Sequence, residues 1–378
     1  MSFLSGFALY AFSFLVVLTA IVFVHEWGHY ILARLNGVRV ETFSVGFGGE
    51  LLGWNDRRGT RWKIGFIPFG GYVKFFGDAG MASNPAREPA NLDPALQAVS
   101  FHHQRLWRRA SIVFAGPAIN FIFGALVFAV IFATAGEPYT PPMVGGVVPG
   151  SAAAVAGFAP GDQVLSIGDH TIDRFEDIRA IVMIEAGTRL DVVVRRDGAL
   201  RHLEVTPKRV SIADGFGGQE QVGQLGITAS AAMEFIRRAP LTALWDGIGQ
   251  TVSVTTESLT YLGRMMIGRE SGAQLSGPIR IAKIAGDVAR MSGIGLISLM
   301  ATLSISIGLV NLFPIPMLDG GHLLFYALEA LRGRPLGERT QEMGFRFGLI
   351  VVMSLFFFAT WNDLVNLRVV SYLTRLVS

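Results

Sequence analysis

The chain contains no cysteine, and charged residues make up only 16% of its 378 positions. The lack of cysteine excludes disulfides, thiolate metal sites and a cysteine nucleophile, so any metal must be held by histidine or carboxylate side chains. Soluble domains carry about 25% charged residues, so the low fraction indicates a membrane protein or a very large core. The net charge is only +3, and no basic run is interleaved with aromatic residues, so no nucleic-acid partner is expected.

Long apolar runs favour the membrane protein. About 20 apolar residues cross the hydrocarbon core of a bilayer, and four segments reach that length. They cover residues 7–32, 110–134, 294–313 and 345–364. The first segment lacks a basic amino-terminal region and is longer than the roughly 15 apolar residues of a signal peptide, so we expect a retained span. An even number of spans places both termini on the same side.

Lysine and arginine predict the orientation of these spans, because cytoplasmic loops are enriched in both residues. Residues 36–109, between the first two spans, carry ten of them. The short loop after the third span carries Arg332, Arg334 and Arg339. We therefore expect both loops in the cytoplasm, and the termini and residues 136–293 outside it.

The external region is expected to divide into two parts. In residues 143–210, "LDVVVRRDG" and "ALRHLEVTP" predict two strands around a turn at Asp197 and Gly198, within a compact β-rich domain. Residues 211–292 are expected to hold a linker followed by a helix, because apolar residues recur on one helical face from 240 to 266. This pattern predicts an amphipathic helix on the membrane surface; a helix packed on the β-rich domain is the alternative.

The cytoplasmic loop contains "RWKIGFIPFGGYVKFFGD", residues 61–78. Apolar and polar residues alternate before a glycine pair, Gly70-Gly71, and an apolar run follows it. This pattern predicts a β-hairpin over 61–76 with an apolar face in or near the membrane. An open edge of this hairpin offers a substrate strand a place to pair by β-addition. A hairpin with a purely structural role is the alternative.

The end of the first apolar run carries "HEWGH", which fits the pattern H-E-x-x-H. On a helix, His25 and His29 lie four residues apart and share one face, so their imidazoles can bind one zinc ion. Glu26 is then placed to take a proton from the attacking water and deliver it to the leaving amine. Ionisable residues within a membrane span cost several kcal/mol and indicate function. Solvated side chains just beyond the span are the alternative.

A catalytic zinc ion has three protein ligands, so one more carboxylate or histidine is needed. The candidates near the later spans are Asp319, His322 and Asp363. The third span is broken by two prolines and ends in "FPIPMLDGGH", and its direction places Asp319 at the cytoplasmic depth of His25 and His29. Asp363 lies near the external end of the fourth span, at the wrong depth. His322 remains a candidate for supporting the ligands.

These motifs resemble those of the site-2 protease family of intramembrane zinc metalloproteases, whose bacterial branch includes the regulators of sigma-E-type envelope stress. "NLFPIPMLDGG" is similar to the family pattern N-x-x-P-x-P-x-L-D-G. The resemblance implies that Asp319 is the third zinc ligand and that Asn311 helps to hold the substrate backbone. "GPAIN" is similar to the family pattern G-P-x-x-N, without a defined role for Asn120.

The β-rich domain resembles the PDZ domains of bacterial proteases. The resemblance is carried by "VVPGSAAAVAGFAPGDQVLSIGDHTI", residues 147–172. It implies a groove that binds the end of an extended peptide. Members of the stress-response branch often have two such domains, whereas this sequence shows one clear copy.

Together these features predict a four-span α-helical membrane protein with a membrane-associated β-hairpin and one external α+β PDZ-like domain. The expected divisions are residues 1–135, 143–210, 211–292 and 293–378. We expect a zinc metalloendopeptidase of the bacterial inner membrane, with a periplasmic PDZ-like domain and an active site near the cytoplasmic side. Its substrates would be single-span membrane proteins, such as an anti-sigma factor, or signal-peptide remnants. A metal-ion transporter or sensor with the same ligands, and a scaffold without activity, are the alternatives.

Overall fold

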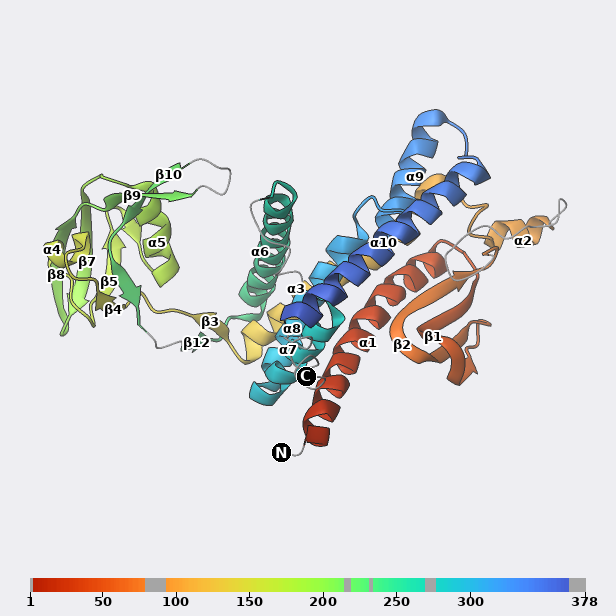
Figure 1. The fold of residues 1–378 in the computed structure, drawn as a ribbon, viewed down its shortest axis with the longest axis horizontal. Helices are drawn as coiled ribbons and strands as arrows, with labels where there is room; N and C mark the ends of the chain where they lie inside the picture. Colours follow the sequence, from red (N-terminus) through yellow and green to blue (C-terminus); the bar gives the residue numbers. More distant parts are fainter. Residues whose placement is uncertain (1–2, 79–92, 214–218, 231–233, 269–276, 367–378) are drawn as a thin grey trace, which may run out of the picture. The chain divides into compact units, whose positions relative to one another are not determined.

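The computed structural model describes residues 3–78, 93–213, 219–230, 234–268 and 277–366 (Figure 1). Four helices in these ranges are long and apolar enough to cross a membrane. They are α1 (Phe3–Leu35), α3 (Leu106–Thr134), α8 (Gly293–Asn311) and α10 (Glu338–Asn366). The apolar segments of the sequence fall on these four helices.

The chain divides into two compact units. The first unit comprises residues 1–130, 244–259 and 272–378, and the second comprises residues 131–243 and 260–271. All four apolar helices belong wholly or mainly to the first unit, and most of the strands belong to the second. Each unit is described by itself.

Glycines let three helices of the first unit approach one another closely. A Cβ atom on Gly28 of α1 would lie 2.3 Å from the carbonyl oxygen of Ala115 in α3. A Cβ atom on Gly308 of α8 would lie 3.0 Å from Cβ of Asn120, also in α3. Between apolar helices in a membrane, such small residues allow the backbones to pack in van der Waals contact. Helix α3 therefore lies against both α1 and α8 at the level of these residues.

The chain between α1 and α3 forms a strongly bent antiparallel pair of strands, which lies next to α1 (Figure 1). It consists of β1 (Val40–Asn55) and β2 (Arg61–Phe75). Aromatic rings fix it to α1: the Phe43 and Trp62 rings stack 4.3 Å apart, and Trp27 of α1 lies 6.0 Å from Trp62. Apolar side chains on the far part of the pair stay exposed, including Phe66 and Leu52.

The hairpin predicted within residues 61–76 is wrong in its pairing. Residues 42–45 of β1 have partners in 71–74 and also in 61–64, so they separate the two halves of β2. Gly70 has a φ of 103° and bends the strand there, but the turn that reverses the chain lies between residues 55 and 61. Local sequence predicts a turn at the glycine pair because it does not reveal that β1 inserts between the two halves of β2.

The remaining helices of the loop and carboxyl-terminal regions are α2 (Pro94–Val99), α6 (Pro240–Met266), α7 (Pro278–Met291) and α9 (Asp319–Arg332). Helix α6 matches the predicted amphipathic helix. Its Gly247 packs against the carbonyl oxygen of Ala125 in α3, and the predicted apolar face, with Ile248 and Val252, is exposed. Within the first unit α6 thus packs on α3, and its position on the membrane surface stays a prediction.

Helix α7 is not predicted by the sequence. Polar contacts hold both of its ends. The fully buried Asp363 of α10 accepts hydrogen bonds of 2.9 Å from the backbone N–H groups of Gly277 and Arg280. Near the other end, the Tyr10 hydroxyl of α1 donates a 2.7 Å hydrogen bond to Asp287. The carboxylate of Asp363 is thus occupied at a helix amino terminus, which favours an anion.

The second unit contains a four-stranded sheet of order β6-β5-β7-β8. Its strands and the neighbouring elements are β4 (Val144–Val147), α4 (Ala152–Ala156), β5 (Gln163–Ile167), β6 (His170–Thr171), α5 (Phe175–Ile184), β7 (Leu190–Arg196) and β8 (Ala199–Val205). The predicted turn is confirmed: Asp197 and Gly198 have φ of 51° and 79°, as in a two-residue hairpin loop.

This unit continues beyond residue 210, where the sequence analysis placed its end. Strand β9 (Lys208–Ala213) pairs with β10 (Gln219–Gln224), and β11 (Ile227–Ala229) pairs with β4. Leu225 is buried in the same core as the sheet. The predicted linker is therefore partly strand, and its residues 214–218 and 231–233 lie outside the described residues.

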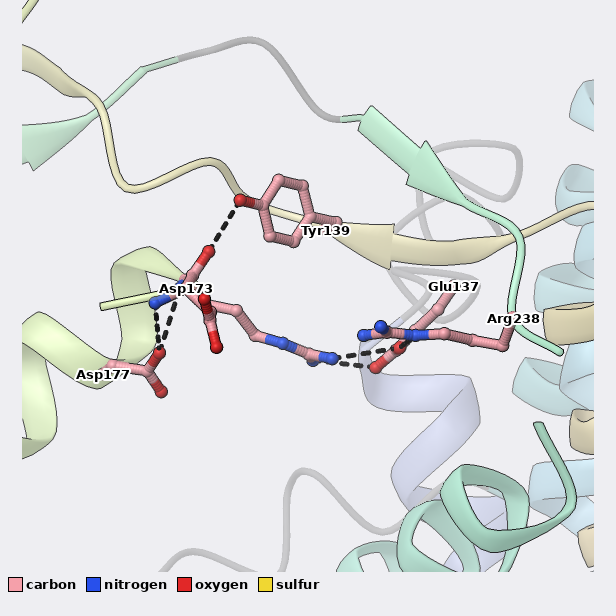
Figure 2. Close-up of polar contacts among 6 residues, drawn as sticks. Glu137, Tyr139, Asp173, Asp177 and Arg238 are labelled. Atoms are coloured by element: carbon pink, nitrogen blue, oxygen red, sulfur yellow. Dashed lines mark hydrogen bonds and ion pairs between the residues drawn. The ribbon is translucent and has the colours of Figure 1, made fainter. Parts of the chain in front are cut away.

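Ion pairs join two segments of this unit that lie near the start and the end of residues 131–243 (Figure 2). Strand β3 (Glu137–Tyr139) pairs with β12 (Glu234–Ile236). Glu137 accepts hydrogen bonds from Arg174 (2.7 Å) and Arg238 (2.8 Å), and the Tyr139 hydroxyl donates to the carbonyl oxygen of Asp173. Partial burial alone would raise the pKa of Glu137, but the two guanidinium groups lower it below its ordinary value.

We expect Glu137→Gln to destabilise the β3–β12 pairing by about 1–3 kcal/mol, because the charged hydrogen bonds to both arginines are lost. The depressed pKa means that the carboxylate contributes stability above about pH 4.5, and that this contribution disappears as the pH falls through the lower folded-state pKa. Hydrogen exchange of the β12 amides at pH 7 measures the loss. Glu204→Gln, which breaks the exposed pair with Arg189, is the control and should leave exchange unchanged.

Candidate active site

Two histidines of α1 and one aspartate of α9 lie together in the first unit. His25 Nε2 is 3.2 Å from His29 Nε2. Asp319 Oδ2 lies 3.1 Å from His25 Nε2 and 3.5 Å from His29 Nε2. The three side chains are largely buried, with exposed fractions between 11% and 16%. The structure thus brings together His25, His29 and Asp319, the three residues that the sequence analysis favours as ligands, and they could hold one metal ion.

The spacing of these atoms fits zinc. A tetrahedral zinc ion with bonds of about 2.0–2.2 Å keeps its ligand atoms about 3.3–3.6 Å apart. Asp319 Oδ2 is buried, and apart from the nearby Nε2 atoms of His25 and His29 it has no polar partner among the described residues, as expected for an oxygen whose partner is a cation. Two imidazoles and a carboxylate leave a fourth position for water or substrate, as in catalytic zinc sites.

A tight turn between α8 and α9 places Asp319. Helix α8 ends at Asn311, and the chain turns with Met317 in the left-handed region at a φ of 83°. Asp319 is then the first residue of α9, where the helix dipole favours a carboxylate. The sequence predicts a loop after Asp319, whereas the structure has helix α9 there. This helix was not predicted because it contains too few apolar residues for a membrane span.

Gly320 and Gly321 follow Asp319 in α9, and neither has a positive φ, so neither forms a left-handed turn. A Cβ atom on either would lie 2.3–2.4 Å from a carbonyl oxygen of the preceding turn, in Leu312, Phe313 or Ile315. The glycines therefore let that turn pack directly onto the start of α9.

Glu26 lies beside the cluster, against the inner end of β2. A Cβ atom on Gly71 would be 3.2 Å from Cγ of Glu26, so the strand passes very close to this side chain. Val73 of the same strand lines a cavity together with Glu26. The strand therefore holds the glutamate next to the two histidines, a contact that the sequence did not predict.

A cavity of about 310 Å³ opens onto these groups. Its lining includes His25, Glu26, His29 and Asp319 together with residues 70–73 of β2. A second cavity of about 670 Å³ lies among α1, α7, α8 and α10 and is lined almost wholly by apolar side chains. Both cavities share Gly70, Ile307 and Asn311. Asn311, at the end of α8, therefore lies where a polar site meets an apolar cavity.

Helix α3 packs behind the two histidines. A Cβ atom on Gly116 would lie 2.3 Å from His29 Nε2, so only glycine leaves room for the imidazole. His29 Nδ1 is 2.9 Å from the carbonyl oxygen of Ile112, and His25 Nδ1 is 3.2 Å from Nδ2 of Asn120. "GPAIN" thus supplies space and polar contacts to the histidines, which the motif alone did not disclose.

The other two candidate residues differ in their placement. His322, one turn after Asp319 in α9, lines the same cavity, and its ring lies 5.3 Å from that of Phe345. It is not among the three converging ligand atoms. Asp363 binds the amino terminus of α7, as described above, and does not join the cluster.

Comparison with known proteins agrees with this geometry. Residues 13–355 match the model of peptidase family M50. A protein of Agrobacterium fabrum with the name "Putative zinc metalloprotease" is 44% identical, covering 97% of both chains. "Metalloprotease MmpA" of Caulobacter vibrioides is 41% identical, covering 95% of this chain and 96% of its own. A solved PDZ domain from Listeria monocytogenes matches 24% of this chain and 88% of its own, with 15% identity and a TM-score of 0.19.

The family match covers most of the chain, and relatives above 40% identity align over nearly their full length. The zinc in the names of these relatives agrees with the two histidines and the aspartate that converge in the structure. The chain is a membrane zinc metalloprotease and belongs to peptidase family M50, the site-2 protease family.

Proposed function

We propose that the protein hydrolyses a peptide bond in or near the transmembrane segment of single-span membrane proteins. The observation that carries this proposal is that the polar cavity and the apolar cavity adjoin and share Gly70, Ile307 and Asn311 in their walls. An apolar substrate segment fits the larger cavity, while its scissile bond reaches the polar one. Burial of apolar side chains there stabilises the complex by about 25 cal/mol per Å² of buried area.

In this proposal His25, His29 and Asp319 bind zinc, which would lower the pKa of a water molecule and polarise the scissile carbonyl. The Glu26 carboxylate takes the proton of the attacking water as its oxygen bonds to the carbonyl carbon. Glu26 then gives that proton to the nitrogen of the leaving amine as the carbon–nitrogen bond breaks. The close approach of Gly71 keeps the Glu26 side chain beside the cavity during both transfers.

The inner end of β2 is a suitable place for the substrate backbone. Residues 71–74 pair with β1 on one side, and residues 70–73 line the cavity with Glu26. A helical substrate must unwind first, because its backbone hydrogen bonds shield the carbonyl groups. The unwound segment can pair with this edge by β-addition, and the Asn311 amide at the opposite wall can bind its backbone.

The expected cellular setting follows from the arginine-rich loops. We place the protein in the bacterial inner membrane, with the active site toward the cytoplasm and the second unit in the periplasm. The strands and helices of the second unit suit a PDZ-like domain that binds peptide ends. The substrate class then includes anti-sigma factors of envelope stress signalling and signal-peptide remnants.

Glu26→Gln should lower the rate of cleavage of a model transmembrane substrate by at least about 100-fold, because the amide cannot accept the proton. Zinc content should remain near that of the wild-type protein, since Glu26 is not a proposed ligand. Cleavage by the purified protein in detergent and metal analysis of the same sample make the measurement. Wild-type cleavage by this variant would exclude the proposed mechanism.

Asp319→Ala should lose zinc as well as activity, because only two ligands remain. Asp363→Asn is the control: it changes another buried carboxylate of the same unit that does not belong to the cluster, and zinc content should be unchanged. Zinc flux into liposomes tests the transporter alternative. That alternative requires flux through the wild-type protein and through the Glu26→Gln variant, whereas the protease transports none.

Asn311→Ala should lower cleavage about 10- to 100-fold while zinc content stays constant, because a hydrogen bond to the substrate backbone worth about 1–3 kcal/mol is lost. The loss should be found mainly in KM if the amide binds the substrate before the reaction. Steady-state kinetics with a fluorescent transmembrane peptide separate KM from kcat. Unchanged kinetics would remove Asn311 from the substrate-binding groups.

A further inference from the structure

Each histidine of the site is contacted on its second ring nitrogen by helix α3. His29 Nδ1 lies 2.9 Å from the carbonyl oxygen of Ile112. A carbonyl oxygen only accepts, so His29 carries its proton on Nδ1, and Nε2 has a free lone pair directed at the cluster. A backbone carbonyl in this position is a common means of fixing the tautomer of a metal-binding histidine.

His25 meets a side chain instead of a carbonyl. Its Nδ1 lies 3.2 Å from Nδ2 of Asn120, which is fully buried. Asn120 Oδ1 is buried as well and has no hydrogen-bond partner among the described residues. A half-turn of the amide about χ2 exchanges the two atoms and brings Oδ1 to Nδ1 of His25. The same residue then supplies to His25 what the Ile112 carbonyl supplies to His29.

The backbone at Asn120 is held firmly from the side opposite the histidines. The Ser304 hydroxyl of α8 donates a 3.3 Å hydrogen bond to the carbonyl oxygen of Asn120. Gly308 of α8 packs against Cβ of Asn120, where any larger residue would collide. The amide can therefore rotate about χ2, but its position beside His25 is fixed by the contact of α3 with α8.

We propose that Asn120 is a positioning residue whose Oδ1 accepts the Nδ1 proton of His25 and thereby directs Nε2 of that histidine to the metal. Asn120 touches neither the metal nor the substrate. This inference rests on the proposed ligand set of His25, His29 and Asp319. It assigns a role to the asparagine of "GPAIN" through the tautomer of one ligand.

Zinc affinity tests the proposal without reference to cleavage. The full-length protein carrying Glu26→Gln is purified in detergent, and its affinity is measured by competition with a chromophoric chelator. Asn120→Leu, similar in size but without an acceptor, should weaken zinc binding about 10- to 100-fold, the usual effect of removing such a hydrogen bond. Asn120→Asp keeps an acceptor and should bind zinc at least as tightly as the parent.

Ser304→Ala is the control for packing, since it removes a contact of the Asn120 backbone and none of the histidine; its affinity should be unchanged. The absorption spectrum of bound Co²⁺ gives a second readout, and it should change in Asn120→Leu and stay the same in Ser304→Ala. If Asn120→Leu does not fold, the smaller Asn120→Ser replaces it, because its hydroxyl is too short to reach Nδ1.

Unchanged zinc affinity in the leucine or serine variant would overturn the proposal. Equal weakening in Asn120→Asp would also overturn it, because the amide would then act as a donor or only as packing. These outcomes are independent of the proposed protease mechanism: cleavage by the Glu26→Gln protein would reject that mechanism while leaving the affinity comparison intact.

Discussion

The close contact between α1 and α3 is the constraint on which the rest of the site depends. Gly28 of α1 lies against the backbone of Ala115, and Gly116 of α3 lies against the ring of His29. With any side chain at either glycine, the helices would separate and the imidazoles would lose their contacts with α3. The two residues between Glu26 and His29 in "HEWGH" thus have their own functions: Trp27 packs against Trp62 of the sheet, and Gly28 leaves room for α3.

This arrangement also makes the polar site compatible with an apolar environment. A charged side chain at the centre of a bilayer costs about 3 kcal/mol or more. Here Glu26 lies in the cavity that residues 70–73 of β2 also line, and the Nδ1 atoms of both histidines meet polar atoms of α3. The groups that remain without such contacts, above all Asp319 Oδ2, face the position proposed for the cation. The polar atoms are thus divided between protein partners and the metal.

The convergence of His25, His29 and Asp319 could be predicted from sequence because their signals are local or chemically rare. His25 and His29 are one helical turn apart, and very few acidic residues besides Asp319 follow the third apolar run. The bent sheet and helices α7 and α9 were not predictable in this way. The position of 42–45 between the halves of β2, and the close packing at Gly320 and Gly321, depend on segments distant in sequence. A residue pattern indicates which face of a helix or strand is apolar, but not which other element packs on that face.

Substitutions in α3 affect its contacts with the two histidines differently. The acceptor for His29 is the backbone of Ile112, which persists with almost any side chain at that position as long as α3 stays helical. The contact of His25 depends on the side chain at position 120, since no backbone carbonyl is recorded near its Nδ1 among the described residues. A single substitution at that position can therefore change the support of one ligand alone. In the proposed zinc site, the buried, rotatable amide would make His25 the ligand through which metal affinity is most easily adjusted.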